Sequence, residues 1–214
     1  MPGRFFDAVA QQRVDAAVKA AEARSLGQIV AVVVEKSDAY PEARLRAGVY
    51  GAMVGAGAAL LLDTRWPLHL FEVVVAQVAV GILFALVANW DPVERVLARG
   101  LRMERAVRQR ALRAFHEHDL HHTARGTGVL VFASLFERRA VVLGDHGIDE
   151  KMGEEAWQQA VDLLAAGMHR GDPATGFCAA IEAVGARLAE HFPRTAAAPG
   201  SGNELPDALR VDRE

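Results

Sequence analysis

The stretch 47–62, AGVYGAMVGAGAALLL, contains sixteen residues and no charged side chain. A second apolar stretch, 68–90, reads LHLFEVVVAQVAVGILFALVANW, and its ionisable side chains, His69 and Glu72, both lie near its start. At about 1.5 Å per helical residue, the sixteen residues cover roughly 24 Å, less than the roughly 30 Å hydrocarbon core of a bilayer. Flanking arginines can make up the difference by snorkelling. The pattern predicts a transmembrane helical hairpin with spans at about 46–63 and 68–90.

The charges around the two spans predict their orientation. Arg44 and Arg46 precede the first span, whereas the connector carries Arg65 balanced by Asp63. The segment after the second span is rich in arginine: Arg95, Arg99, Arg102, Arg105, Arg108, Arg110 and Arg113. Because segments rich in Lys and Arg stay on the cytoplasmic side, we expect a multi-pass protein of the cell (inner) membrane with both termini in the cytoplasm.

Aromatic and basic side chains mark the ends of the spans. Tyr50, Trp66 and Trp90 lie near these ends, where interfacial aromatic residues are enriched in membrane proteins. The arginine-rich helix after the second span has two interpretations, a solvated face or a face against anionic lipid head groups. The alternative for the hairpin itself is an apolar core inside a soluble protein, but a domain of this size would hardly cover two helices that are apolar all round.

Small and polar residues inside the spans are candidates for helix association. Gly51 and Gly55 have the small-xxx-small spacing that lets two helices approach closely, which predicts self-association or packing against another membrane protein. Glu72 and Gln77 lie five residues apart in the second span. An intramembrane carboxylate is by default a functional hypothesis, so Glu72 is a candidate for helix association or ion handling.

The remaining segments alternate between helical and strand patterns. Residues 4–26 have the apolar spacing of an amphipathic helix, and 29–34, IVAVVV, has the β-branched composition of a buried strand. After the second span we expect a basic helix (to about residue 123), a β-hairpin (129–136 and 139–145), a loop (145–149), two helices (153–171 and 174–192) and a mostly disordered tail (194–214).

These elements predict one small α/β domain that is interrupted by a membrane insertion. Residues 1–45 form its N-terminal part, 46–90 the hairpin and 91–193 its C-terminal part. An even number of spans returns the chain to the side of the membrane from which it left, so both parts can join in one domain.

Composition excludes several classes of function. The net charge of −3 gives no bulk basicity for nucleic-acid binding. The single cysteine, Cys178, excludes an internal disulfide and a cysteine-rich zinc module, and its apolar helical context is typical of a buried thiol. The N-terminus has no apolar core or cleavage site typical of a secretory signal peptide.

The stretch 116–122, HEHDLHH, is the most concentrated group of potential metal ligands. On a helix, His118 shares a face with His121 and His122, and Asp119 is a further candidate ligand for zinc. The stretch lacks the HExxH arrangement of metalloproteases, and histidines near a helix C-terminus are also favoured by the helix dipole. A metal site and a solvated helix end are the two interpretations.

Several stretches together resemble the bacterial TPM domain, specifically its short membrane-embedded form related to YgcG-type proteins. The matching stretches are QIVAVVVEKSDAYPEARLR (28–46), TGVLVFASLFERRAVVLGDHGI (127–148), the helix with Trp157, GFCAAIEAVGARLAEHFP (176–193) and NELPD (203–207). The resemblance covers about two thirds of the chain. It implies a small α/β/α sandwich, here interrupted by the transmembrane hairpin.

The resemblance also implies two activities, because some TPM domains act as acid phosphatases and some bind calcium through acidic loops. Longer relatives have an Asp-Asn-Gly segment before the second strand, where this chain has RGTG at 125–128 without a carboxylate. Glu137, Asp145, Asp149 and Glu150 remain as candidate calcium ligands, or as turn and cap residues.

We therefore expect no catalytic residue and no required cofactor. The expected function is a non-enzymatic binding or assembly/repair accessory in the membrane, and the alternative is a membrane-tethered, divalent-cation-dependent phosphatase.

Overall fold

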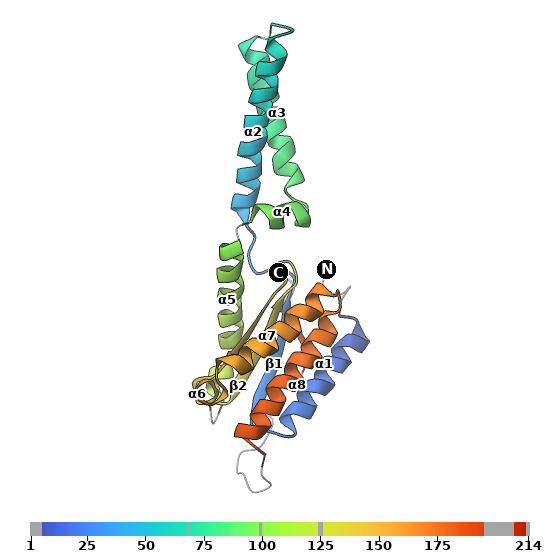
Figure 1. Cartoon of the computed structure of the whole chain (residues 1–214), viewed down its shortest axis with the longest axis vertical. Coiled ribbons are helices and arrows are strands. Elements are labelled where there is room, and N and C mark those ends of the chain that lie inside the picture. Colours follow the sequence, from blue (N-terminus) through green and yellow to red (C-terminus); the bar gives the residue numbers. More distant parts are fainter. Residues whose placement is uncertain (1–5, 68, 99, 124–125, 195–207, 213–214) are drawn as a thin grey trace. The chain divides into compact units, whose positions relative to one another are not determined.

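The computed structural model describes residues 6–67, 69–98, 100–123, 126–194 and 208–212. The chain forms two compact units (Figure 1). Met1–Ser37 and Glu104–Glu214 make the first, which we call the α/β unit, and Asp38–Met103 makes the second, which we call the hairpin unit.

The α/β unit is built on a four-stranded mixed sheet in the order β3-β2-β1-β4. The strands are β1 (Gln28–Val34), β2 (Gly128–Ser134), β3 (Arg139–Gly144) and β4 (Arg210–Asp212). β1 is parallel to both β2 and β4, and β2 is antiparallel to β3. Every residue of β1 and β2 is buried, as expected for central strands covered on both faces.

Helices cover both faces of this sheet. Ile29, Ala31 and Val33 face a core made with α1 (Ala8–Glu22), α6 (His146–Met152), α7 (Glu154–His169) and α8 (Pro173–His191). The alternate residues Val30, Val32 and Val34 face a second core made with α5 (Gly100–Glu117). Because alternate side chains of a strand point to opposite faces of the sheet, the apolar strands need helices on both faces. The expected α/β class is confirmed.

Small residues allow α8 to lie close to its neighbours in the first of these layers. A Cβ added at Gly167 of α7 would lie 2.5 Å from the Cα of Gly176 in α8. A Cβ added at Gly185 of α8 would lie 2.6 Å from the Cβ of Ala21 in α1. The three helices α1, α8 and α7 lie side by side in Figure 1 because these positions carry no side chain.

The hairpin unit contains α2 (Pro41–Asp63), α3 (Leu70–Val87) and the short α4 (Asp91–Leu97). α2 and α3 run antiparallel and pack along their length (Figure 1). Arg102 closes the base of the unit, because its Nε lies 2.8 Å from a Glu42 oxygen and its Nη2 lies 3.2 Å from an Asp38 oxygen. The expected hairpin is therefore present as a pair of long apolar helices.

Three local expectations differ from the structure. The tail expected to be disordered contains β4, which pairs with β1 from Val32 to Val34, whereas 195–207, with the NELPD stretch, lie outside the described residues. The segment expected as a loop after Asp145 is α6, because Asp145 caps its first turn. The basic helix is split, because Ala98 has extended backbone angles between α4 and α5.

Candidate membrane-anchoring site

The hairpin unit presents large apolar side chains outward along both helices. Leu61 is 74% exposed and Leu70 is 81% exposed. Of the α3 residues that the structure describes, Gly81 is buried and the others are exposed or partly exposed. Further exposed residues on the same two helices are Leu45, Val49, Met53, Val54, Leu60, Phe71, Val74, Val75, Val78, Ile82, Leu83 and Leu86. Soluble proteins rarely expose a continuous apolar surface of this extent to water.

The dimensions of the hairpin match those of a bilayer. Both α2 and α3 are long and apolar enough to cross a membrane. The eighteen residues of α3 rise about 27 Å, close to the roughly 30 Å hydrocarbon core. Trp66 precedes α3 and Trp90 follows it, and both are exposed. The two tryptophans therefore mark two levels that are separated by about one bilayer core, where interfacial aromatics lie.

Polar side chains satisfy backbone groups at the ends of the two helices. The Thr64 hydroxyl donates to the Leu61 carbonyl (2.7 Å) and the Asn89 amide donates to the Leu86 carbonyl (3.1 Å). At the start of α3, the backbone N–H of His69 donates to a Glu72 carboxylate oxygen (3.0 Å). Glu72 thus acts as a capping residue in the first turn of α3, a role that sequence analysis did not assign.

A short helix, α4, is tied to α2 at the base of the hairpin. α4 crosses the foot of α2 and α3 in Figure 1. The Arg46 guanidinium in α2 donates to the Leu97 carbonyl at the end of α4 (3.1 Å). Val96 of α4 is 85% exposed.

Helix α5 separates its apolar and basic residues sharply. Val107 and Ala111 pack against the sheet, whereas Arg105, Arg108 and Arg113 are exposed. In the part of the chain that the structure describes, no carboxylate forms an ion pair with these three arginines. The helix therefore presents a positively charged face outward from the α/β unit.

The glycine face of α2 is closed inside the hairpin. A Cβ added at Gly51 would lie 2.6 Å from the Phe84 Cβ, and one added at Gly55 would lie 2.9 Å from the Gln77 Cα. Gly81 of α3 likewise approaches the Gly48 carbonyl. The close approach predicted from the spacing is made within one chain. Self-association through Gly51 and Gly55 would require the hairpin to open.

The histidine-rich stretch forms the end of α5 and the turn after it. Asp119 has a left-handed backbone with φ 53°, and the 3₁₀ turn Leu120–His122 follows. The rings of His116 and His121 meet edge to face, with centroids 4.9 Å apart. Among the described residues, no three His, Cys, Asp or Glu side chains gather into a metal-ligand group; the His122 side chain lies outside that description.

The acidic candidate ligands are divided between the two ends of the sheet. Glu137 follows β2 and accepts from the Ser37 backbone N–H (3.0 Å) and from the Ser134 hydroxyl. Asp145 follows β3 beside Gly128, at the opposite end of β2, and accepts from the His146 backbone N–H (2.7 Å). The seven residues of β2 hold these ends about 20 Å apart. Asp149 and Glu150 belong to α6, and their side chains lie outside the described part of the chain.

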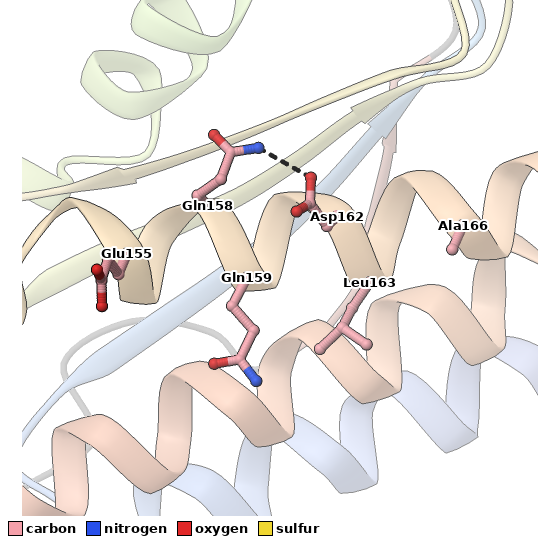
Figure 2. A pocket seen from close by; sticks show the side chains of 6 residues that line it. All are labelled: Glu155, Gln158, Gln159, Asp162, Leu163 and Ala166. Atoms are coloured by element: carbon pink, nitrogen blue, oxygen red, sulfur yellow. Dashed lines mark hydrogen bonds between the residues drawn. The ribbon is translucent and has the colours of Figure 1, made fainter.

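One shallow hollow lies along the outer face of α7 (Figure 2). Six side chains of this single helix line it: Glu155, Gln158, Gln159, Asp162, Leu163 and Ala166. The Gln158 amide donates to an Asp162 carboxylate oxygen across one turn (2.8 Å). This hollow contains no nucleophile–base pair and therefore offers no catalytic arrangement among its lining residues.

Comparison with known proteins supports the fold. No protein-family model and no curated protein matches the sequence. The chain is similar to the NMR structure of the BA42 protein from the psychrophilic bacterium Bizionia argentinensis, with a TM-score of 0.60 and 17% sequence identity. The match covers 97% of this chain and 96% of BA42. At this identity the likeness concerns the fold alone.

Proposed function

We propose that this chain is an integral protein of the inner membrane, in which α2 and α3 cross the bilayer. The α/β unit then lies on the cytoplasmic side as a TPM-like domain. It serves as a non-enzymatic binding or assembly accessory for another membrane protein.

The outward apolar surface of the hairpin is the observation that carries this proposal. Fully burying one Val, Leu, Ile or Phe side chain stabilises by about 1.5–3 kcal/mol, so a dozen such side chains amount to roughly 20 kcal/mol. Placing Glu72 in the membrane costs about 3 kcal/mol on translocon-insertion scales, and less near an interface. Insertion is therefore favoured by a wide margin over exposure of the same helices to water.

The distribution of charge supports the proposed orientation. Arg44 and Arg46 lie in the first turns of α2, before the first span crosses, and the arginines of α5 follow the second span in the sequence. The tip between the helices carries Arg65 together with Asp63. The positive-inside rule then places the tip outside and the α/β unit in the cytoplasm.

The alternative, a membrane-tethered phosphatase dependent on a divalent cation, receives less support from the acidic side chains. A calcium site needs several oxygen ligands around one ion. Glu137 and Asp145 lie at opposite ends of the sheet, and each already accepts hydrogen bonds from its own neighbours. The binding-accessory proposal is preferred for this reason.

Alkaline carbonate extraction and flotation of membranes test the insertion. The wild-type chain is expected to stay with the membranes. Replacing Val74, Val78 and Ile82 of α3 together by Lys removes three exposed apolar side chains and adds three charges inside the membrane. The change costs about 5 kcal/mol per position and should release a large part of the protein. The matched variant Val96→Lys, exposed on α4 at the base, should stay membrane-bound because lysine can snorkel there. A wild-type chain that remains in the supernatant without detergent would refute the proposal.

Thiol labelling of intact cells tests the orientation. The background is Cys178→Ser, which removes a half-buried thiol whose pKa is raised by burial. A membrane-impermeant maleimide should label Thr64→Cys at the tip in intact cells. It should label Gln159→Cys on α7 only after lysis. The reverse result would place the α/β unit outside the cytoplasm.

A further inference from the structure

Helix α5 carries a group of arginines on the face that it turns outward. Arg105, Arg108 and Arg113 are exposed on this face. Leu112 lies among these arginines and is 42% exposed. We call these four residues the basic face. The opposite face of α5 packs against the sheet, and α1, α7 and α8 lie on the other side of the sheet (Figure 1). The α/β unit therefore presents the basic face to its surroundings.

The carboxylates of α5 do not neutralise the basic face. Glu104 is directed to another arginine, because its carboxylate lies 3.7 Å from the Arg139 guanidinium at the start of β3. Glu117 likewise lies 3.1 Å from the Arg110 guanidinium. In the described part of the chain, no carboxylate forms an ion pair with the three arginines of the basic face. Their positive charges are therefore available to a negatively charged partner.

The chain connects the start of α5 closely to the proposed membrane spans. Gly100, the first residue of α5, follows the end of α3 at Val87 by thirteen positions. Arg102, in the first turn of α5, forms ion pairs with Asp38 and Glu42 at the start of α2. The first two arginines of the basic face follow Arg102 within about 10 Å along the helix axis, which is about one Debye length at 0.1 M salt.

An anionic membrane surface fits these features. The cytoplasmic leaflet contains negatively charged phospholipids, which attract basic residues that lie next to a transmembrane helix. A guanidinium group matches the geometry of a phosphate group and can donate two hydrogen bonds to it. Leu112 adds an apolar side chain among the arginines, a combination that suits the boundary between head groups and acyl chains.

We propose that the basic face of α5 binds anionic phospholipid head groups of the membrane that holds the hairpin, and this inference rests on the proposed insertion. A basic residue near an anionic surface raises the ratio of bound to unbound helix about fivefold, so three arginines raise it on the order of a hundredfold. Because α1, α7 and α8 cover the opposite face of the sheet, they then face the cytoplasm, where they are accessible to a partner protein.

Fluorescence quenching of the full-length chain in vesicles tests this binding. A dye is attached at Gln109→Cys, an exposed position of α5 beside the basic face, in the Cys178→Ser background. Phosphatidylcholine vesicles carry a fixed amount of a head-group quencher in both leaflets. Replacing part of the phosphatidylcholine by phosphatidylglycerol should increase quenching, and added salt should reverse the increase. The same dye at Gln159→Cys on α7, on the other side of the sheet, should show no increase.

Charge-neutral variants identify the residues responsible. Replacing Arg105, Arg108 and Arg113 together by Gln should lower the ratio of bound to unbound α5 on the order of a hundredfold, and each single replacement about fivefold. A matched control removes the same charge from exposed positions outside α5 and should keep the wild-type response: Lys19→Gln, Arg170→Gln and Arg187→Gln combined.

The outcomes separate this inference from the function on which it rests. A chain that does not float with the vesicles overturns the membrane proposal itself. A chain that floats, but whose quenching at position 109 is the same with and without phosphatidylglycerol, overturns only the binding of the basic face to lipid. A control variant that loses the response as completely as the α5 variant also overturns it, because net charge rather than the basic face would then cause the effect.

Discussion

Gly51 and Gly57 belong to the same helix but have opposite surroundings. A side chain at Gly51 would collide with Phe84 and with the Val80 carbonyl, whereas nothing lies within 4 Å of a Cβ at Gly57. We therefore expect Gly51→Val to destabilise the helix pair by about 1–3 kcal/mol, the usual cost of overpacking. Thermal unfolding of the full chain in detergent micelles would measure this. Equal midpoints for Gly51→Val and Gly57→Val would contradict the packing described.

Asp172, the N-cap of α8, should make the stability of the fold depend on pH. Hydrogen bonds from the Thr175 hydroxyl and backbone N–H hold the pKa of Asp172 below its usual value. Because its pKa is lower in the folded state, the Asp172 carboxylate contributes fully to the free energy of unfolding above the unfolded pKa of about 3.9. This stabilising contribution is lost as the pH falls through the folded pKa.

We expect Asp172→Ala to lower stability at pH 7 by about 1 kcal/mol or less, the cost of losing an exposed N-cap. The difference from wild type should shrink as the pH falls below about 4. Thermal unfolding of wild type and Asp172→Ala at pH 7 and at pH 3 measures the stability difference at each pH. Asp162→Ala, which removes an exposed carboxylate in the middle of α7, is the control because Asp162 caps no helix. A difference that stays constant with pH would argue against the capping role.

Single residues also show where sequence reasoning reaches its limit. The carboxylates Glu137 and Asp145 are only eight positions apart in the sequence, and both were candidate calcium ligands. The β2–β3 pairing places them at opposite ends of the sheet. The hairpin expected from the sequence, with strands at 129–136 and 139–145, already implies this separation, because Glu137 lies in its turn and Asp145 at the far end of its second strand. The capping contact of Glu72 could not be predicted in this way, because it depends on the residue at which α3 begins.

At the level of elements, the sequence predicts best those segments whose own composition favours their structure. The β-branched run of β1, the β2–β3 hairpin and the two apolar helices were all expected and are present. β4 was missed because its three residues follow a tail rich in small and polar residues. Its structure depends on pairing with β1 and on Leu209, whose backbone N–H donates to Asp15 of α1 (2.7 Å).

The pairing between β4 and β1 can be tested by shortening the chain. A chain that ends at residue 207 loses the strand, whereas a chain that ends at residue 212 retains it. We expect backbone amides between Val32 and Val34 to exchange hydrogen faster in the shorter chain, because this part of β1 becomes an edge. Hydrogen exchange of both chains in micelles measures the effect. Identical exchange rates would show that β4 does not protect β1.

At the scale of the whole molecule, the proposal of a binding accessory makes a prediction about activity. On this proposal, purified protein should hydrolyse no phosphate monoester above background with calcium or magnesium, because Glu137 and Asp145 lie at opposite ends of the sheet and cannot bind one ion together. Asp145→Asn should alter the stability of α6 rather than turnover, because Asp145 caps this helix. Metal-dependent hydrolysis that Asp145→Asn abolishes would instead favour the phosphatase.

The position of the hairpin unit within the α/β unit has a consequence for biosynthesis. Gln28 of β1 pairs with Gly128 of β2, so paired residues of these neighbouring strands are 100 positions apart in the sequence. At about 5–20 residues per second, the ribosome needs roughly 5–20 s to make the partner of β1. Both spans leave the ribosome during this interval. Under the proposed insertion, the nascent β1 stays unpaired while the two helices enter the membrane, and this apolar strand needs shielding from aggregation until the sheet can close.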